Sequence, residues 1–335
     1  MKFGPVPVAE AAGAIVAHTI RRGALVLKKG QRVTAEHQSA LIGAGVDTIV
    51  VARLEAGDIG EDEAARRLAE RLAGPHIRLE RAFTGRVNLF AEAAGLIIVD
   101  AAAIDRLNAI DEAITAATLP AHHVVAPGDM AATVKIIPFA APLVALKRAL
   151  AEVGEGAVRV APFRPLRIGV VSTILPGVKP SVVAKTLRVL EERLAPAGGR
   201  IAQELRTPHE AEPLAKALTP LAKTSDLVII FGASAITDRR DVIPAAIEES
   251  GGRIDHFGMP VDPGNLLLLG ELDGKPVIGA PGCARSPKEN GFDWVLQRLL
   301  AGVPIGPKEI KSMGVGGLLM EIAQRPQPRL GDGGE

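Results

Sequence analysis

Short apolar runs alternate with longer amphipathic stretches through the second half of the chain. These runs predict strands at 168–171, 201–205, 227–231, 266–269 and 277–280. Between the first two, Val183, Leu187, Leu190 and Leu194 fall at i, i+4, i+7 and i+11, which is the spacing of one helix face. Apolar strands that alternate with helices are typical of a parallel sheet covered on both faces. The pattern predicts a doubly wound α/β domain with a mostly parallel sheet over residues 161–323.

Further helices are predicted from Pro208, over 242–250 and from Pro287. Two of them follow similar tetrapeptides, Thr207-Pro208-His209-Glu210 and Ser286-Pro287-Lys288-Glu289. A hydroxyl residue followed three positions later by glutamate is the capping-box pattern, and proline suits the first helical position. We therefore expect Thr207 and Ser286 to cap helices.

The first half mixes strands with alanine-rich stretches and predicts a smaller α+β domain over residues 1–160. The expected helices are 36–43, 61–72, 103–117 and 142–151, the expected strands are 46–51 and 96–99, and a hairpin or meander is expected over 124–139. Pro120 is expected to end the third helix. The final stretch, 324–335, is rich in proline and glycine and is predicted to be disordered.

Composition narrows the classes of function. The 335 residues carry 39 Lys+Arg against 38 Asp+Glu, a net charge of +1 that gives no reason to expect a nucleic-acid or acidic-membrane partner. One cysteine rules out a disulfide framework and a CxxC zinc site. No apolar run is long enough to cross a bilayer, and the first 18 residues do not resemble a signal peptide. We therefore expect a cytoplasmic protein.

Three loops that follow predicted strands carry the candidate chemistry. They are residues 172–177, 232–241 and 281–285, and each combines small residues and backbone N–H groups with a following helix. In an open parallel sheet, ligands bind beyond the carboxyl ends of the strands, and a helix N-terminus favours an anion such as phosphate. None of the loops matches the Walker pattern or GxGxxG, so a generic nucleotide fold is not supported.

The segments FGASAITDRRDVIPAA, PVDPGNLLLLG and PVIGAPGCARSP resemble the molybdopterin-binding domain shared by molybdopterin molybdotransferases and molybdopterin adenylyltransferases. The chain is most similar to the molybdopterin-binding half of bacterial proteins whose other half is a cofactor nucleotidylyltransferase. The stretch GAIVAHTI…GVDTIVV resembles the leader region of the molybdotransferases. Three positions depart from the family pattern: Ala233 replaces a glycine, Cys283 stands where asparagine is common, and Thr207 replaces an acidic residue that helps to hold Mg²⁺ or molybdate.

The resemblance implies a set of site residues. Molybdopterin is expected at Ser172, Thr173, Gly232, Ala233, Ser234, Pro263, Gly264, Asn265, Pro281, Gly282, Cys283 and Arg285. Asp238 and Asp241 are expected as catalytic residues and as ligands of Mg²⁺ or molybdate, since hard oxygen ligands suit Mg²⁺. The alternative for Asp241 is a structural place in the first turn of its helix, the alternative for Asp238 is an N-cap, and that for Arg285 is a solvated surface charge.

The resemblance implies a molybdenum-cofactor biosynthesis protein that binds molybdopterin or its nucleotide form. If it is an enzyme, a Mg²⁺-dependent transferase of molybdate or nucleotidyl groups is expected, which acts by orientation and charge neutralisation because no nucleophile–base pair is visible. Two alternatives stay open. One is a non-catalytic carrier that delivers molybdopterin to a separate nucleotidylyltransferase or apoenzyme, and the other is a nicotinamide-nucleotide deamidase-like enzyme. A homo-oligomer is expected from the resemblance alone.

Overall fold

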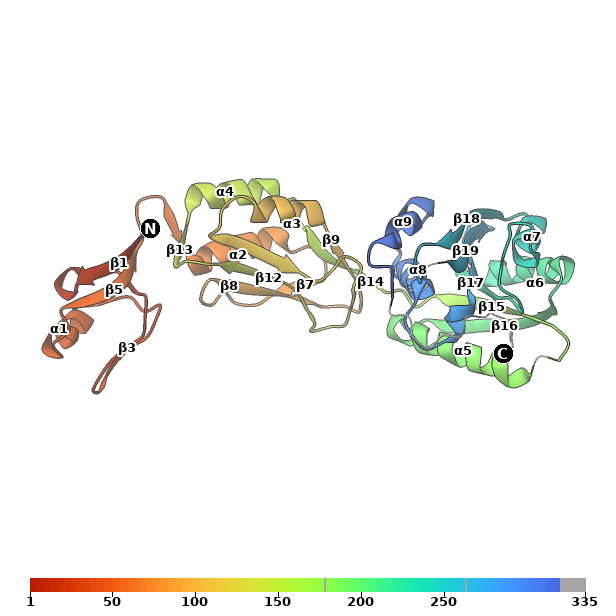
Figure 1. Cartoon of the computed structure of the whole chain (residues 1–335), viewed down its shortest axis with the longest axis horizontal. Coiled ribbons are helices and arrows are strands. Elements are labelled where there is room, and N and C mark those ends of the chain that lie inside the picture. Colours follow the sequence, from red (N-terminus) through yellow and green to blue (C-terminus); the bar gives the residue numbers. More distant parts are fainter. Residues whose placement is uncertain (178, 263, 320–335) are drawn as a thin grey trace, which may run out of the picture. The chain divides into compact units, whose positions relative to one another are not determined.

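The computed structural model describes residues 1–177, 179–262 and 264–319. The chain divides into two compact units, Met1–Pro162 and Phe163 onward, and we describe each by itself (Figure 1). The predicted disordered stretch 324–335 lies outside the described residues. None of the described helices combines the length and the apolar character that a bilayer crossing needs.

The second unit is an α/β domain built on a six-stranded sheet, as predicted. Its strand order is β16-β15-β17-β20-β19-β18. The strands are β15 (Arg167–Ile174), β16 (Arg200–Pro208), β17 (Leu227–Phe231), β18 (Arg253–Met259), β19 (Asn265–Leu272) and β20 (Lys275–Ala280). The first four strands in the sheet order are parallel, whereas β19 and β18 run antiparallel to their neighbours.

Helices cover both faces of this sheet (Figure 1). They are α5 (Pro180–Leu194), α6 (Ala211–Thr224), α7 (Val242–Glu249), α8 (Gly291–Ala301) and α9 (Pro307–Lys311). Leu190 of α5 and Leu296 of α8 pack in one core with Ile229 of β17. The opposite core joins α6 and α7 to Ile230 of the same strand. Because β17 is buried on both faces, its sequence LVIIF has no polar position, and this is why the strand is easy to predict.

Both predicted capping boxes in this unit are wrong. β16 continues to Pro208, so Thr207 lies in a strand opposite Thr173, and α6 begins only at Ala211. The proline is tolerated because β16 is the edge strand, where a missing N–H breaks no ladder bond. At the other site, α8 begins at Gly291 and its capping box is formed by Asn290 and Asp293, not by Ser286.

The first unit holds short antiparallel sheets, of orders β1-β5-β2, β10-β12-β8-β7, β11-β9-β14, β13-β6 and β3-β4. The strands are β1 (Lys2–Pro7), β2 (Ile15–Val16), β3 (Ile20–Arg22), β4 (Leu25–Leu27), β5 (Thr48–Arg53), β6 (Asp58–Gly60), β7 (Ile77–Leu79), β8 (Arg86–Ala91), β9 (Gly95–Val99), β10 (Ile114–Thr118), β11 (Val124–Val125), β12 (Met130–Ile136), β13 (Ala140–Pro142) and β14 (Val158–Pro162). The helices are α1 (Ala35–Gly43), α2 (Glu61–Leu72), α3 (Ala101–Asn108) and α4 (Leu143–Glu152).

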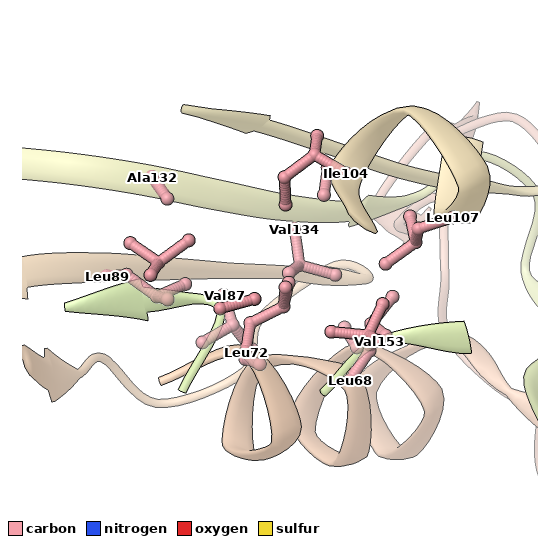
Figure 2. Packing of buried hydrophobic residues seen from close by; sticks show 14 of the residues in the cluster. Leu68, Leu72, Val87, Leu89, Ile104, Leu107, Ala132, Val134 and Val153 are labelled. Carbon is pink, nitrogen blue, oxygen red and sulfur yellow. The ribbon is translucent and has the colours of Figure 1, made fainter. Parts of the chain in front are cut away.

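Two separate aliphatic cores stabilise this unit. The larger one packs Leu68 and Leu72 of α2 and Leu107 of α3 against Val87 of β8 and Val134 of β12 (Figure 2). The smaller one lies under β1, β5 and α1 and contains Val8, Leu41 and Val51. Alanine fills many of the remaining positions in the larger core, which lets helices approach the sheet closely.

Two predicted elements of the first unit are wrong. The helix expected over 103–117 ends at Asn108, and 114–118 is strand β10. The Asn108 side chain donates to the Ala116 carbonyl and accepts from the Ala116 N–H, so it binds the following strand instead of continuing the helix. The hairpin expected over 124–139 does not form, because β11 pairs with β9 whereas β12 pairs with β8 and β10. Alanine has high helix propensity, but strand pairing overrides it here.

Candidate functional site

The three predicted loops meet at one edge of the six-stranded sheet. Ser172 of β15 lies opposite Phe231 of β17, and Phe231 lies opposite Ala280 of β20. These strands are parallel, so their carboxyl ends point the same way and the loops that begin after them are neighbours. Strand order alone therefore brings residues 172–174, 232–234 and 281–285 to the same edge.

Thr173 joins the first two loops. The Ala233 N–H donates to Thr173 Oγ1 over 2.8 Å, and the same oxygen lies 2.8 Å from His209 Nδ1. Ser172 points to the opposite face of the sheet, is 3 % exposed, and its Oγ has no hydrogen-bond partner among the described residues. A buried hydroxyl without a partner is costly, so Ser172 is a candidate ligand-binding group.

Arg285 joins the second and third loops. Its guanidinium donates to the Gly232 carbonyl and to Thr186 Oγ1 of α5, each over 2.9 Å, and lies 5.4 Å from the centre of the Phe231 ring. Burial lowers the pKa of Arg285 from its ordinary value. Because these contacts already engage both terminal nitrogens, the geometry suits a residue that positions the loops, and a direct contact with phosphate would have to share these donors.

The third loop is a short 3-10 turn, Gly282–Arg285, and the Arg193 side chain of α5 hydrogen-bonds to its backbone. Arg193 donates to the carbonyls of Ala284, Ser286 and Lys288 over 2.9, 2.7 and 3.3 Å. It also forms an ion pair with Asp293, and the two side chains are 10 % and 9 % exposed. Arg193 was missed by sequence reasoning, since an arginine on an amphipathic helix gives no signal of the loop it will hold.

The thiol of Cys283 lies between the side-chain amides of two asparagines. Its Sγ is 3.4 Å from Asn265 Nδ2 and 3.4 Å from Asn290 Oδ1. Both asparagines are buried, at 5 % and 4 % exposure. Gly282 beside it is exposed, and an added Cβ there would meet nothing within 4 Å. The predicted residue Pro281 is buried at the start of this turn, Gly264 adopts φ +89°, and Pro263 lies outside the described residues.

The second loop is tightly folded. A Cβ on Gly232 would lie 2.6 Å from the Ser234 carbonyl oxygen, so only glycine fits there without moving the loop. Ser234 itself is exposed, and its Oγ makes one long contact, 3.4 Å, to the Ala235 carbonyl. The loop therefore presents the Ser234 hydroxyl to solvent at the edge of the sheet.

The two predicted carboxylates already accept hydrogen bonds inside this loop. Asp241 is the N-cap of α7: its Oδ1 accepts from the Val242 N–H over 2.7 Å and its Oδ2 from the Thr237 N–H over 3.1 Å. Asp238 Oδ1 accepts from the N–H and Nε of Arg240 over 2.9 and 2.7 Å, and this hydrogen bonding lowers the pKa of Asp238. The sequence left an N-cap open for Asp238 and a first-turn position for Asp241, whereas in the structure Asp241 is the N-cap.

These carboxylates do not fit a resident Mg²⁺. In the part of the chain that the structure describes, no group of three or more His, Cys, Asp or Glu side chains could hold a metal ion. Mg²⁺ needs near-octahedral oxygen ligation, and both carboxylate oxygens of Asp241 and Oδ1 of Asp238 are engaged with N–H donors. We therefore derive no step through a protein-bound metal.

Comparison with known proteins gives two family matches. Residues 169–304 match the model described as "Probable molybdopterin binding domain", and residues 5–53 match a domain of unknown function. Curated proteins give no match. Among solved structures, a molybdopterin biosynthesis MoeA protein from Pyrococcus horikoshii is 15% identical with a TM-score of 0.31, covering 90% of this chain and 76% of that one. The molybdopterin biosynthesis enzyme MoaB from Thermus thermophilus is 18% identical with a TM-score of 0.31, covering 42% and 98%.

Proposed function

Residues 169–304 form a domain of the molybdopterin-binding family, and from this premise we propose that the chain binds molybdopterin, or its nucleotide form, in molybdenum-cofactor biosynthesis. The phosphate of the pterin lies over the edge where β15, β17 and β20 end. Ser172 and Ser234 supply hydroxyl groups and the 281–285 turn supplies backbone N–H groups. The observation that carries this proposal is a pair of hydrogen bonds that connect the three loops. One runs from the Ala233 N–H to Thr173 Oγ1, and the other from the Arg285 guanidinium to the Gly232 carbonyl.

These two hydrogen bonds support binding because they hold the loops in place before a ligand arrives. A loop that is held by hydrogen bonds before the ligand arrives loses little conformational entropy on binding. Backbone N–H groups and hydroxyls carry no negative charge, so the site favours an anion over a cation. The unpartnered Oγ of Ser172 supplies a donor that only a ligand or water can satisfy.

Binding and delivery of the cofactor is the role we favour over group transfer. Asp241 caps a helix with both oxygens engaged and Asp238 Oδ1 is paired with Arg240, so a metal or a water molecule would have to share these oxygens or use Asp238 Oδ2 alone. A second candidate role is Mg²⁺-dependent transfer of molybdate or a nucleotidyl group, in which Asp241 would also have to hold the metal. An Asp241→Asn variant, which keeps a capping oxygen, separates the two roles. It leaves molybdopterin affinity unchanged if the protein is a carrier, and it abolishes turnover with Mg²⁺ and ATP or CTP if the protein is a transferase.

The binding proposal is tested with Gly282→Trp. A side chain at this position enters open space, so the variant is expected to fold normally and to block the approach of a ligand to the third loop. Isothermal titration with molybdopterin should show binding to the unmodified protein and at least tenfold weaker binding to the variant. Gly154→Trp is the matched control, because Gly154 also has nothing within 4 Å of an added Cβ and lies in the first unit.

Equal affinity of Gly282→Trp and the unmodified protein would exclude the third loop from the site. Absence of molybdopterin binding to the unmodified protein would overturn the proposed function itself.

A further inference from the structure

Thr207, which the sequence predicted to cap a helix, and His209 form a polar corner beside Thr173. Thr207 lies opposite Thr173 in the parallel ladder, so both side chains point to the same face of the sheet. This is the face covered by α6 and α7, where Val171 and Leu205 two residues earlier pack. Thr207 Oγ1 is buried and has no hydrogen-bond partner among the described residues. His209 follows on the same side, 2.8 Å from Thr173 Oγ1.

The hydrogen bonds of Thr173 leave its hydroxyl proton with only two choices. A hydroxyl has one proton and two acceptor lone pairs. One lone pair accepts from the Ala233 N–H. If His209 Nδ1 lacks a proton, the Thr173 hydroxyl donates to it and no proton remains for a ligand. If His209 Nδ1 carries a proton, it donates to the second lone pair, and the Thr173 hydroxyl proton is released toward the open edge.

We propose that Thr207, Thr173 and His209 form an oxyanion subsite of the molybdopterin-binding edge, in which the protonation of His209 Nδ1 decides whether Thr173 can donate to the ligand. This proposal rests on the proposed function, since it places one oxyanion group of that ligand, a phosphate or molybdate oxygen, at this corner. The unpartnered Thr207 hydroxyl donates to the same group. His209 is a positioning residue that acts through Thr173, and binding of the anion favours the ring form that has its proton on Nδ1.

The neighbouring helix is compatible with an anion at this corner. α6 begins at Ala211 without a side-chain cap, because the Glu210 side chain at the N-cap makes no hydrogen bond to the first turn. Its first N–H groups are therefore available to solvent or to a ligand. The charged groups on the elements around His209 are Arg200, Glu204 and Arg206 on β16, Glu210 between β16 and α6, Glu212, Lys216 and Lys223 on α6, Lys179 before α5, and Asp238, Arg239, Arg240 and Asp241 in the 232–241 loop. β15 contributes none beyond Arg167.

The experiment measures the affinity for inorganic phosphate and for molybdopterin in the unmodified protein and in a variant at His209. His209→Asn keeps an N–H donor near the Nδ1 position, so the Thr173 hydroxyl proton stays available to the ligand. We expect His209→Asn to bind phosphate at least as tightly as the unmodified protein, and several-fold weaker binding would contradict the proposal.

Thr207→Val is expected to weaken phosphate binding about tenfold, and Thr207→Ser to restore it. Thr219→Val and His256→Asn are the matched controls, since Thr219 lies on the exposed side of α6 and His256 lies on the far edge strand β18. Long-range ¹H–¹⁵N spectra of the histidine rings provide a readout that a purely structural role would not change. Saturating phosphate should shift the His209 ring to the form with a proton on Nδ1.

The outcomes separate this proposal from the proposed function. If molybdopterin binds equally to Thr207→Val, Thr207→Ser and the unmodified protein, and the His209 ring does not respond, the subsite is wrong and the binding function stands. If phosphate shows the expected pattern and molybdopterin does not bind, the subsite stands and the proposed ligand is wrong. If neither ligand binds the unmodified protein, both proposals are overturned.

Discussion

The two units of the chain bury their polar groups very differently. Among the described residues, all the buried polar or charged side chains lie in the second unit, and they are Ser172, Thr173, Thr186, Ser225, Asn265, Asn290 and Asp293. The buried side chains of the first unit are all apolar. Burial of a polar group costs free energy unless a partner satisfies it. The second unit therefore carries a cost that the first unit avoids, and part of that cost falls on Ser172, at the end of β15 where we place the ligand.

Packing alone explains the buried side chains of the first unit, but it does not explain those of the second. The larger core of the first unit is aliphatic and alanine-rich, so each buried residue has a structural reason. In the second unit, the buried hydroxyls of Ser172, Thr207 and Ser225 have no hydrogen-bond partner among the described residues.

The largest effect is expected from truncating the cores. Phe231→Ala should lower the free energy of unfolding of the second unit by about 3–5 kcal/mol, and Leu89→Ala that of the first by about 2–5 kcal/mol. Trp294, the single tryptophan, lies in the second unit, so its fluorescence reports that unit alone during denaturant unfolding. We expect Phe231→Ala to shift the fluorescence midpoint and Leu89→Ala to leave it in place. Equal shifts would show that the units unfold together.

The next effect comes from the ion pairs. Asp293 and Arg193 form a buried pair in the second unit, and loss of one partner leaves a buried charge, so Asp293→Ala should cost about 3 kcal/mol of unfolding free energy. In the first unit, Glu63 pairs with Arg66 on an exposed helix face, where water screens the interaction. Glu63→Ala is therefore the matched control and should cost much less. Urea denaturation measures the loss of unfolding free energy in each variant. Similar losses in Asp293→Ala and Glu63→Ala would contradict this prediction.

The smallest effect is acid sensitivity, in which the two units should be alike. Hydrogen bonding to Arg167 lowers the pKa of Asp226 in the second unit from 3.8 to about 2, and hydrogen bonding to Arg66 and Arg67 lowers the pKa of Glu63 in the first from 4.5 to about 2. A lowered pKa stabilises the folded state above the unfolded-state value, and this contribution is lost as pH falls through the folded-state value.

Stability should accordingly fall between about pH 4.5 and pH 2, and Asp226→Asn and Glu63→Gln should each flatten the profile slightly. Both side chains are partly exposed, so each contribution is small. Unfolding midpoints recorded between pH 2 and pH 6 provide the measurement. If the dependence of the unfolding midpoint on pH is the same in both variants as in the unmodified protein, these ion pairs make no measurable contribution to the free energy of unfolding.

Periodicity predicted the α/β fold of the second unit because its central strands are apolar on both faces. It failed at β18, whose sequence RIDHFGM mixes polar and apolar positions at the edge of the sheet, and at β10, where the alanine-rich run ITAAT resembles a helix. Edge and alanine-rich strands depend on their pairing partners, which lie far away in the sequence. The two predicted helix N-termini were wrong for a related reason. Thr207 and Ser286 have the local chemistry of caps, but Thr207 is paired in a strand ladder and the Ser286 carbonyl accepts from Arg193.

The candidate site shows the same division. The loops 172–177, 232–241 and 281–285 could be predicted because small residues and hydroxyls follow apolar strands. Three features could not: Arg285 turned inward onto Gly232, the capping role of Asp241 with both oxygens engaged, and the contact between His209 and Thr173. Each depends on which residues approach across the edge of the sheet, and no local pattern encodes that.

The alternation of strands and helices in the second unit and the three loops of small and hydroxyl residues follow from local sequence, because burial on two faces and tight turns restrict the residue types allowed. Which hydroxyls are left without partners, and which charged groups are already paired, depends on the folded arrangement of the whole domain. Hydrogen bonds are short and directional, so their partners are settled by strand register and helix packing over distances in sequence that periodicity does not span.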